Sequence, residues 1–506
     1  MQSTAPQANS NHEKLIFGHP IGLFVLFLTE MWERFSYYGM RAILFLYMTT
    51  DIIKGGMGMK DKEAGAVYGI YVASIYLLSL PGGWLADNVF GQKKSVIYGG
   101  LIIILGHLIL AIPGNNIVFY IGLSIVSIGT GALKPNISSL VGELYPEGGA
   151  RRDAAFSIFY MGINLGGAFG MIIVGYLGEK INWHFGFGAA AIGMILGMII
   201  FKILGNKYLE PYGHLKVQEL NTNKEEVNIK NQILPFVLTL MLIIVLLYIP
   251  YFKNIQFYSA NGLAKILLII ILSIAVFYFM FILFAGRLNA VEKKRMAVMV
   301  IFFIASVLFW SGYEQGGTTL NIFAERYTNR SILNFTIPAS WMQSLQSIFV
   351  IALAPVMAFV WTYLGRKNKN PSASIKLSSG LIILGLAFFI MYFAAKLVVG
   401  NNNLSPLWLL STYFFSVLGE VCLSPVGLSF YTKLSPQRFV SQMMGIWFVS
   451  LSLGNLISGL IGGEFNKDSV AEMPGMFMYI VYSSVGFGIL MLIFSKQIKK
   501  WMGGVE

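Results

Sequence analysis

Cysteine and charged side chains are scarce in this chain of 506 residues. It has a single cysteine, Cys422, which excludes an internal disulfide and any metal or redox centre built from several cysteines. Only 12% of the residues are charged, against about 25% in an average soluble protein, whereas 56% are hydrophobic. These proportions exclude an ordinary soluble domain and predict an all-α protein that crosses the membrane many times.

Catalytic and nucleotide-binding motifs are also missing. The sequence contains no Gly-x-Ser-x-Gly, no His-Glu-x-x-His and no Walker loop. We therefore expect no enzyme activity, no cofactor and no metal, and an ion gradient rather than ATP as the energy source. The net charge is +13, but the basic residues are scattered between apolar segments instead of forming a patch, so we expect no nucleic-acid partner.

Apolar segments long enough to cross a bilayer, which takes about 20 residues, recur along the whole chain. We count fourteen, at residues 22–48, 64–86, 95–113, 117–143, 154–176, 186–204, 233–252, 263–285, 297–319, 339–364, 375–399, 407–431, 439–462 and 474–495. If the N-terminus is cytoplasmic, the even-numbered turns carry basic pairs such as Arg151 with Arg152 and Arg366 with Lys367. The positive-inside rule then places both termini in the cytoplasm. We expect the protein in the cell (inner) membrane.

An internal repeat divides the chain into two halves. Leu-Lys-Pro at 133–135 recurs 290 residues later as Leu-Ser-Pro at 423–425. This predicts two six-helix bundles related by an axis along the membrane normal, with a substrate site between them near the midplane. The seventh and eighth segments become an extra central pair with a structural role. The predicted divisions are a cytoplasmic tail (1–18), an N-terminal bundle (19–205), linkers with the extra pair (206–296), a C-terminal bundle (297–496) and a second cytoplasmic tail (497–506).

The first segment carries charges that a spanning helix seldom tolerates. Together with Tyr37, they lie at helical spacings of three and four along one face: Glu30, Glu33, Arg34 and Arg41. Each ionised side chain at a helix centre costs roughly 2.5 to 3.5 kcal/mol on insertion scales, so these groups must face one another or a wet cavity. Because Arg34 can neutralise either glutamate, one of them can take and release a proton as the cavity opens and closes. A static ion-pair network that fixes the helix is the alternative.

The other deep charges differ in sign between the two halves. Lys134 lies in the first half with Arg41, whereas Glu314 and Glu420 lie in the second. A central cavity would then have a cationic wall and an anionic wall, which predicts a zwitterionic substrate. In the empty protein we expect these walls to pair, Arg41 with Glu314 and Lys134 with Glu420. The alternative is that the pairs are latches between the halves that never contact a ligand.

Several uncharged side chains are further candidates for substrate contact. Asn164 offers an amide among small glycines and could bind a substrate carbonyl. Five aromatic residues offer surface for side chains of varied size, with helix packing as the alternative for each: Tyr37, Tyr38, Tyr76, Trp310 and Trp447. His107 lies in an apolar segment without nearby charge, and we interpret it as a hydrogen-bonded core residue.

Several blocks of the sequence resemble the motifs of a known family. Residues 30–41 read Glu-Met-Trp-Glu-Arg-Phe-Ser-Tyr-Tyr-Gly-Met-Arg, which resembles the Glu-x-x-Glu-Arg signature of proton-dependent oligopeptide transporters, within the major facilitator superfamily. Gly-Gly-Trp-Leu-Ala-Asp at 82–87 is similar to the loop motif after the second helix. Further blocks that resemble the family lie at 131–136, 156–167, 310–315 and 420–429. The extra central pair is similar to that of bacterial members.

The resemblance implies a symporter that imports di- and tripeptides with protons by alternating access, and we expect it to be monomeric. A relative that carries another small solute, such as nitrate or an amino-acid derivative, is the alternative. By position, the charged residues fall into two implied roles. Those implied to couple protons are Glu30, Glu33, Arg34 and Glu314. Those implied to bind the peptide ends are Arg41 and Lys134 at the carboxylate and Glu420 at the amino group.

The resemblance also implies uncharged contacts. Asn164 would bind the peptide backbone, and the residues implied to line the pocket are Tyr37, Tyr38, Tyr76, Trp310, Ser424 and Trp447. One departure concerns Gln346 and Ser347, which stand where the family commonly has Asn-Pro. Gln346 therefore takes the place of an asparagine expected near the peptide amino end. Without that proline, any bend of this helix must come from elsewhere, and Pro355 is the candidate.

Overall fold

The computed structural model of the protein describes residues 15–215, 259–398, 403–465 and 467–504. Within these ranges it is an all-α membrane protein, as the composition predicts, and 11 of its helices are long and apolar enough to cross a membrane. Every predicted segment coincides with a helix except the seventh, residues 233–252, which lies outside the described ranges. Short hairpins precede the first helix, β1 (Leu15–Ile16) with β2 (His19–Pro20), and the eleventh, β3 (Ser331–Ile332) with β4 (Phe335–Thr336).

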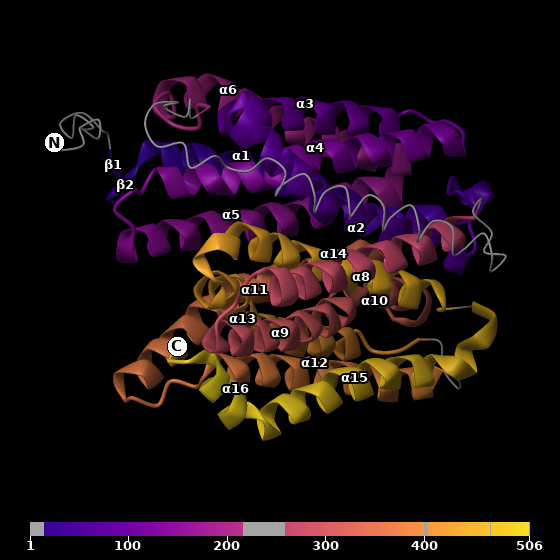
Figure 1. The fold of residues 1–506 in the computed structure, drawn as a ribbon. Helices are drawn as coiled ribbons and strands as arrows, with labels where there is room; N and C mark the ends of the chain where they lie inside the picture. Colours follow the sequence, from indigo (N-terminus) through magenta and orange to yellow (C-terminus); the bar gives the residue numbers. More distant parts are fainter. Residues whose placement is uncertain (1–14, 216–258, 399–402, 466, 505–506) are drawn as a thin grey trace.

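The helices pack in two groups with an extra helix between them (Figure 1). The N-terminal helix group consists of α1 (Ile21–Thr49), α2 (Asp61–Leu85), α3 (Gln92–Ala111), α4 (Asn116–Glu143), α5 (Gly149–Tyr176) and α6 (Trp183–Tyr208). The C-terminal helix group consists of α9 (Ala290–Tyr313), α10 (Thr319–Tyr327), α11 (Ala339–Arg366), α12 (Ala373–Val398), α13 (Leu407–Leu434), α14 (Val440–Gly463) and α15 (Met473–Ile493). A short helix, α16 (Ser495–Met502), follows α15.

Two helix pairs join the groups, α2 with α14 and α5 with α11, and α8 (Ala260–Ala285) packs against both α2 and α14. Small residues allow the α2–α14 approach. A Cβ atom on Gly65 would lie 2.4 Å from the carbonyl oxygen of Gly459, so only glycine fits at this crossing. Such small-residue contacts are the usual basis of close helix packing in membranes, where lipid is as apolar as the side chains.

Helix α1 differs from the other long helices because four charged side chains interrupt its apolar sequence. All four are buried: Glu30, Glu33, Arg34 and Arg41. His107 of α3 is also buried behind α1, where its Nε2 atom lies 2.7 Å from the hydroxyl of Ser36. This contact confirms the interpretation of His107 as a hydrogen-bonded core residue.

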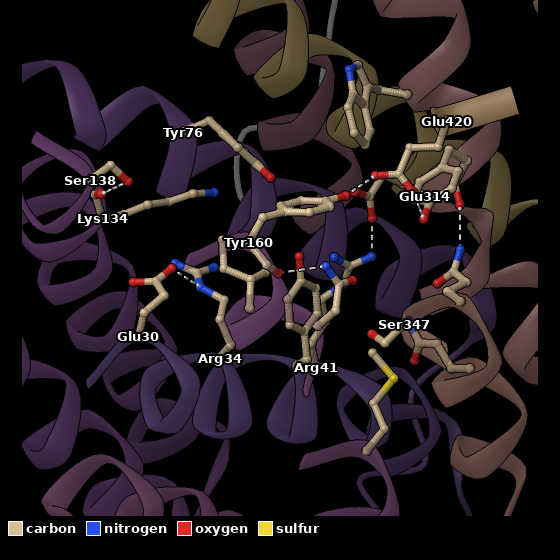
Figure 2. Close-up of a pocket in the computed structure, with 18 residues that line it drawn as sticks. Glu30, Arg34, Arg41, Tyr76, Lys134, Ser138, Tyr160, Glu314, Ser347 and Glu420 are labelled. Atoms are coloured by element: carbon tan, nitrogen blue, oxygen red, sulfur yellow. Dashed lines mark hydrogen bonds and ion pairs between the residues drawn. The ribbon is translucent and has the colours of Figure 1, made fainter. Parts of the chain in front are cut away.

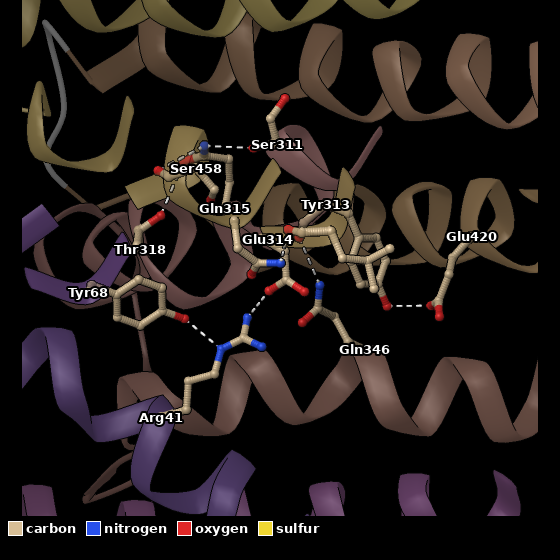
Figure 3. Close-up of polar contacts among 12 residues, drawn as sticks. Arg41, Tyr68, Ser311, Tyr313, Glu314, Gln315, Thr318, Gln346, Glu420 and Ser458 are labelled. Atoms are coloured by element: carbon tan, nitrogen blue, oxygen red, sulfur yellow. Dashed lines mark hydrogen bonds and ion pairs between the residues drawn. The ribbon is translucent and has the colours of Figure 1, made fainter. Parts of the chain in front are cut away.

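The helix that the sequence predicts at 297–319 is interrupted. Helix α9 ends at Tyr313, a 3₁₀ turn covers Glu314–Gly317, and α10 begins at Thr319. The Gln315 side chain stabilises the break by donating to the carbonyl of Ser311, at 2.9 Å, and to the carbonyl of Ser458 on α14, at 3.3 Å (Figure 3). The turn places Glu314 at the centre of the molecule, where it faces α1.

Candidate functional site

A cavity of about 240 Å³ lies between the two helix groups, and charged side chains from both groups reach it (Figure 2). Helices α1, α2, α4 and α5 contribute from one group, and α9, α11 and α13 from the other. The cavity brings together most of the residues that the sequence predicts for the site: Glu30, Arg34, Tyr38, Arg41, Tyr76, Lys134, Asn164, Trp310, Glu314, Gln346 and Glu420.

Arg34 lies between two glutamates on the same face of α1. Its Nε atom donates to Glu30 Oε1 at 2.8 Å, in the i, i+4 geometry that the spacing predicts. Glu33 Oε2 is 2.7 Å from the same Nε atom, but it lies off the N–H direction and neither Glu33 oxygen has a hydrogen-bond partner among the described residues. Arg34 is therefore hydrogen-bonded to one glutamate and only ion-paired with the other.

Arg41 and Glu314 form an ion pair that joins α1 to the turn after α9 (Figure 3). The Nη2 atom of Arg41 donates to Glu314, and its Nε atom donates to the hydroxyl of Tyr68 on α2 at 2.6 Å. Both side chains of the pair are nearly inaccessible, with 5% and 6% of their surface exposed. The contact therefore joins the two helix groups through a buried pair of opposite charges.

Glu420 does not pair with Lys134 in this structure, contrary to the sequence prediction. Its carboxylate accepts hydrogen bonds from two tyrosine hydroxyls, Tyr160 at 3.2 Å and Tyr313. The Lys134 ammonium instead lies over the ring of Tyr76, 3.9 Å from its centroid, which is an attractive cation–π geometry. The predicted pair rests on opposite charge alone. In the structure, tyrosine hydroxyls bind the Glu420 carboxylate and an aromatic ring faces the Lys134 ammonium.

Three other predicted residues lie behind the cavity wall, and a fourth has no described side chain. Glu33 and Tyr37 are buried in α1, and the Tyr37 ring packs against that of Tyr38 with centroids 5.0 Å apart. Trp447 of α14 packs against Tyr431 of α13, at 5.5 Å between ring centroids, and does not line the cavity. Ser424 belongs to α13, but its side chain lies outside what the structure describes.

The cavity wall also contains residues that the sequence analysis missed: Tyr160, Tyr313, Ser138, Gln343, Ser347, Ile163 and Met171. Two of them carried a signal. Tyr160 precedes Asn164 by one helical turn, and the Asn164 amide donates to the Tyr160 carbonyl at 2.9 Å. Tyr313 directly precedes Glu314. The sequence predicts their neighbours Asn164 and Glu314 as site residues, but nothing in it indicates that the two tyrosine hydroxyls contact Glu420.

Polar contacts between the groups also close one end of the molecule. Arg326 at the end of α10 donates two hydrogen bonds, at 2.9 and 2.8 Å, to Asp61 at the start of α2. Glu179, after α5, accepts from the backbone amides of Ala339 and Ser340 at the start of α11. The unpaired amides of that helix N-terminus are thus satisfied by a carboxylate from the other group.

Comparison with known proteins identifies the family. The family model described as "POT family" matches residues 93–476. A Yersinia enterocolitica protein named "Peptide transporter YePEPT" is 37% identical over 98% of each chain. A crystal structure titled "peptide transporter POT in complex with sulfate" superimposes with a TM-score of 0.86 at 38% identity, covering 97% of this chain and 98% of that one.

A second solved structure, of "a POT family transporter in complex with 5-aminolevulinic acid", has a TM-score of 0.83 at 33% identity and covers 96% of this chain and 98% of that one. The protein therefore belongs to the POT family of multi-pass membrane transporters, the family that its motifs resemble.

The Arg41–Glu314 pair provides a test of how much this buried contact stabilises the protein. Glu314→Ala leaves a guanidinium buried without its counter-charge, and such losses typically cost about 3–5 kcal/mol. We expect a clear fall in the thermal unfolding midpoint of the purified protein. The double variant Arg41→Met with Glu314→Leu should recover part of the loss, because it removes both charges.

The matched control is Glu464→Ala, which removes a glutamate from another ion pair between the groups, Lys62–Glu464 at 2.7 Å. These side chains are 55% and 59% exposed, so the change should cost about 0–1 kcal/mol. Equal shifts of the midpoint for Glu314→Ala and Glu464→Ala would contradict the role given to the buried pair.

Proposed function

We propose that this protein is a proton-coupled symporter that imports di- and tripeptides by alternating access. The observation that carries the proposal is the distribution of charge in the cavity: Arg41 and Lys134 come from one helix group, and Glu314 and Glu420 from the other. A zwitterionic peptide has a carboxylate at one end and an ammonium group at the other, so it can contact both walls at once. The relatives that are named peptide transporters support the same substrate class.

The cavity suggests how the peptide lies. Of the three described cations that line the cavity, Arg34 and Arg41 are ion-paired and Lys134 is not. We therefore assign the peptide carboxylate to Lys134, with Arg41 joining when its pair with Glu314 opens. Glu420 takes the ammonium group, and Asn164 binds the peptide backbone. The side chains of the bound peptide then contact the other predicted residues that line the cavity: Tyr38, Tyr76, Trp310 and Gln346.

Proton coupling is assigned to the glutamates around the two arginines of α1. Glu33 is ion-paired with Arg34 without a hydrogen bond, so it can change its charge without breaking one. Glu30 keeps its hydrogen bond to Arg34 and orients the guanidinium. Protonation of Glu314 would remove the attraction that joins Arg41 to the C-terminal group and free Arg41 for the peptide. Protons are the only coupling partner that this scheme requires.

The arrangement corresponds to a carrier that faces the cytoplasm. The contacts of Asp61 with Arg326 and of Glu179 with α11 close the end of the molecule opposite the hairpin β1–β2 and helix α16 (Figure 1). The positive-inside rule assigns the hairpin end to the cytoplasm, as well as both termini.

We propose that the two helix groups are the rigid units that rock about the peptide. Helix α8 and its predicted partner have a structural role, and the monomer is the working unit.

A second candidate substrate is an amino-acid derivative. The relative solved in complex with 5-aminolevulinic acid favours it, because that molecule also carries an amine and a carboxylate. Both candidates fit opposed charged walls, and they differ in the need for a peptide bond. Competition between unlabelled 5-aminolevulinic acid and a labelled dipeptide for uptake into proteoliposomes ranks the two.

Glu33→Gln tests the assignment of proton coupling. The glutamine cannot exchange a proton, so uphill accumulation of dipeptide into proteoliposomes under an inward proton gradient should be abolished, while exchange of dipeptide across the membrane persists. Membrane potential contributes about 2.3 kcal/mol per charge per 100 mV, so an inside-negative potential should also fail to drive accumulation by the variant. Glu147→Gln, at an exposed glutamate paired with Arg151, is the control and should accumulate dipeptide normally. Full accumulation by Glu33→Gln would remove Glu33 from the coupling mechanism.

Blocked peptides test the assignment of the two peptide ends. An N-acetylated dipeptide leaves Glu420 without its ammonium partner, and such losses at buried charges cost about 2 to 5 kcal/mol, or some thirtyfold upwards in affinity. It should compete poorly for uptake by the wild type and lose little more in Glu420→Gln, whereas the free dipeptide should lose much of its affinity there. A C-terminally amidated dipeptide should behave in the same way towards Lys134→Gln. Equal competition by free and blocked dipeptides in the wild type would mean that the charges serve only as gates.

A further inference from the structure

The two oxygens of Glu420 accept hydrogen bonds from tyrosines of different helix groups. The Tyr160 hydroxyl, on α5 of the N-terminal group, donates to Oε1 at 3.2 Å. The Tyr313 hydroxyl, on α9 of the C-terminal group, donates to Oε2. Because Glu420 itself lies on α13, the Tyr313 bond stays within one group and the Tyr160 bond crosses between the two. The crossing bond must therefore break whenever α5 and α13 separate.

Tyr160 provides the cross-group contact at Glu420, in place of the ion pair with Lys134 that the sequence predicts. In the view of Figure 2 its ring lies between Lys134 and Glu420, and its hydroxyl points to the glutamate. Tyr160 and Glu420 both line the cavity, so a bound molecule can reach the bond between them. The neutral hydroxyl thus makes the cross-group contact at Glu420 while leaving Lys134 over Tyr76.

The two ends of a zwitterion meet different obstacles in this cavity. A carboxylate that arrives at Lys134 displaces no ion pair among the described residues. An ammonium group that arrives at Glu420 meets a carboxylate whose oxygens already accept from both hydroxyls. The hydroxyl–carboxylate bond has one charged partner, whereas an ammonium group at the same carboxylate adds the attraction between two opposite charges, so it can replace a tyrosine hydroxyl there.

We propose that Tyr160 is the contact that the substrate's ammonium group displaces at Glu420, so that recognition of the amino end releases a bond between the two helix groups. Tyr313 stays bonded to Glu420 and orients its carboxylate throughout. This inference rests on the proposed function and deepens it, because it assigns amino-end selectivity and one step of gating to the same hydroxyl.

The matched variants Tyr160→Phe and Tyr313→Phe test the proposal, since each removes one hydroxyl from the same acceptor. Spin labels on cysteines introduced at two exposed positions report the separation of the groups: Ala150, in the first turn of α5, and Asn368, just beyond the end of α11. Both positions lie at the end of the molecule away from the Asp61–Arg326 contact. The native Cys422 is buried, which keeps it from the label. Distance distributions are measured by pulsed electron resonance with and without the dipeptide Ala-Ala, and the affinities of Ala-Ala and of N-acetyl-Ala-Ala are measured in parallel.

In the absence of peptide, Tyr160→Phe should move the distance distribution towards the one that the wild type shows with Ala-Ala, and Tyr313→Phe should not. Because the ammonium group no longer has to displace a hydroxyl, Tyr160→Phe should also bind Ala-Ala about two- to tenfold more tightly than the wild type. N-acetyl-Ala-Ala has no ammonium group, so its affinity should not change in Tyr160→Phe. Tyr313→Phe should bind Ala-Ala more weakly, because Glu420 loses its orienting partner.

Equal distance shifts in the two variants, or no shift in either, would overturn the assignment of Tyr160 as the cross-group contact. Weaker binding of Ala-Ala by Tyr160→Phe would overturn the displacement and leave both tyrosines as orienting residues. A wild type that binds no dipeptide would contradict the proposed function and the displacement with it. The distances measured without peptide would still decide whether Tyr160 joins the groups.

Discussion

A charge buried within a membrane has to be compensated by protein groups, and this requirement organises the centre of the molecule. Helix α1 places Glu30, Glu33, Arg34 and Arg41 where neither lipid nor bulk water solvates them. Arg34 is compensated within the helix, whereas Arg41 is compensated by Glu314 from the other helix group. The Arg34 contacts stay within α1 and leave the two helix groups free to move, whereas the Arg41–Glu314 pair joins them. Any event that changes the charge of Glu314 therefore changes how strongly the two groups are joined.

The two contacts across the cavity differ in kind. Arg41 with Glu314 is a buried ion pair, and a proton on the glutamate or a competing carboxylate at the arginine would weaken it. Tyr160 with Glu420 is a neutral donor on a carboxylate, and an ammonium group can replace it. A proton or a carboxylate thus acts on the Arg41–Glu314 pair, and an amine acts on the Tyr160–Glu420 bond. A zwitterion that bridges both walls acts on both contacts, which neither a simple acid nor a simple amine can do.

The sequence predicts the fold well because apolar length and small residues determine helix number and packing. The α2–α14 contact at Gly65 and Gly459 becomes visible only in the structure. Apolar length does not predict the break after Tyr313, because a window of spanning length averages over the polar and glycine residues of the turn at 314–317. At the site, the charges on α1 stand out in any apolar sequence. The partners of Glu420 do not, because a tyrosine in a membrane helix is usually a packing residue. Pairing by sign alone gave Lys134 for Glu420, and only the positions of the hydroxyls show otherwise.

The central claim is that opposed charges from the two helix groups receive the two ends of one peptide. The most direct measurement is a structure of the protein with a bound dipeptide, at a resolution that distinguishes its ends. The account predicts the carboxylate within hydrogen-bond distance of Lys134 and the ammonium group within hydrogen-bond distance of Glu420, with the Tyr160 hydroxyl displaced from that glutamate. A dipeptide bound in the reverse direction, or bound with Tyr160 still bonded to Glu420 and no contact to Lys134, would contradict it.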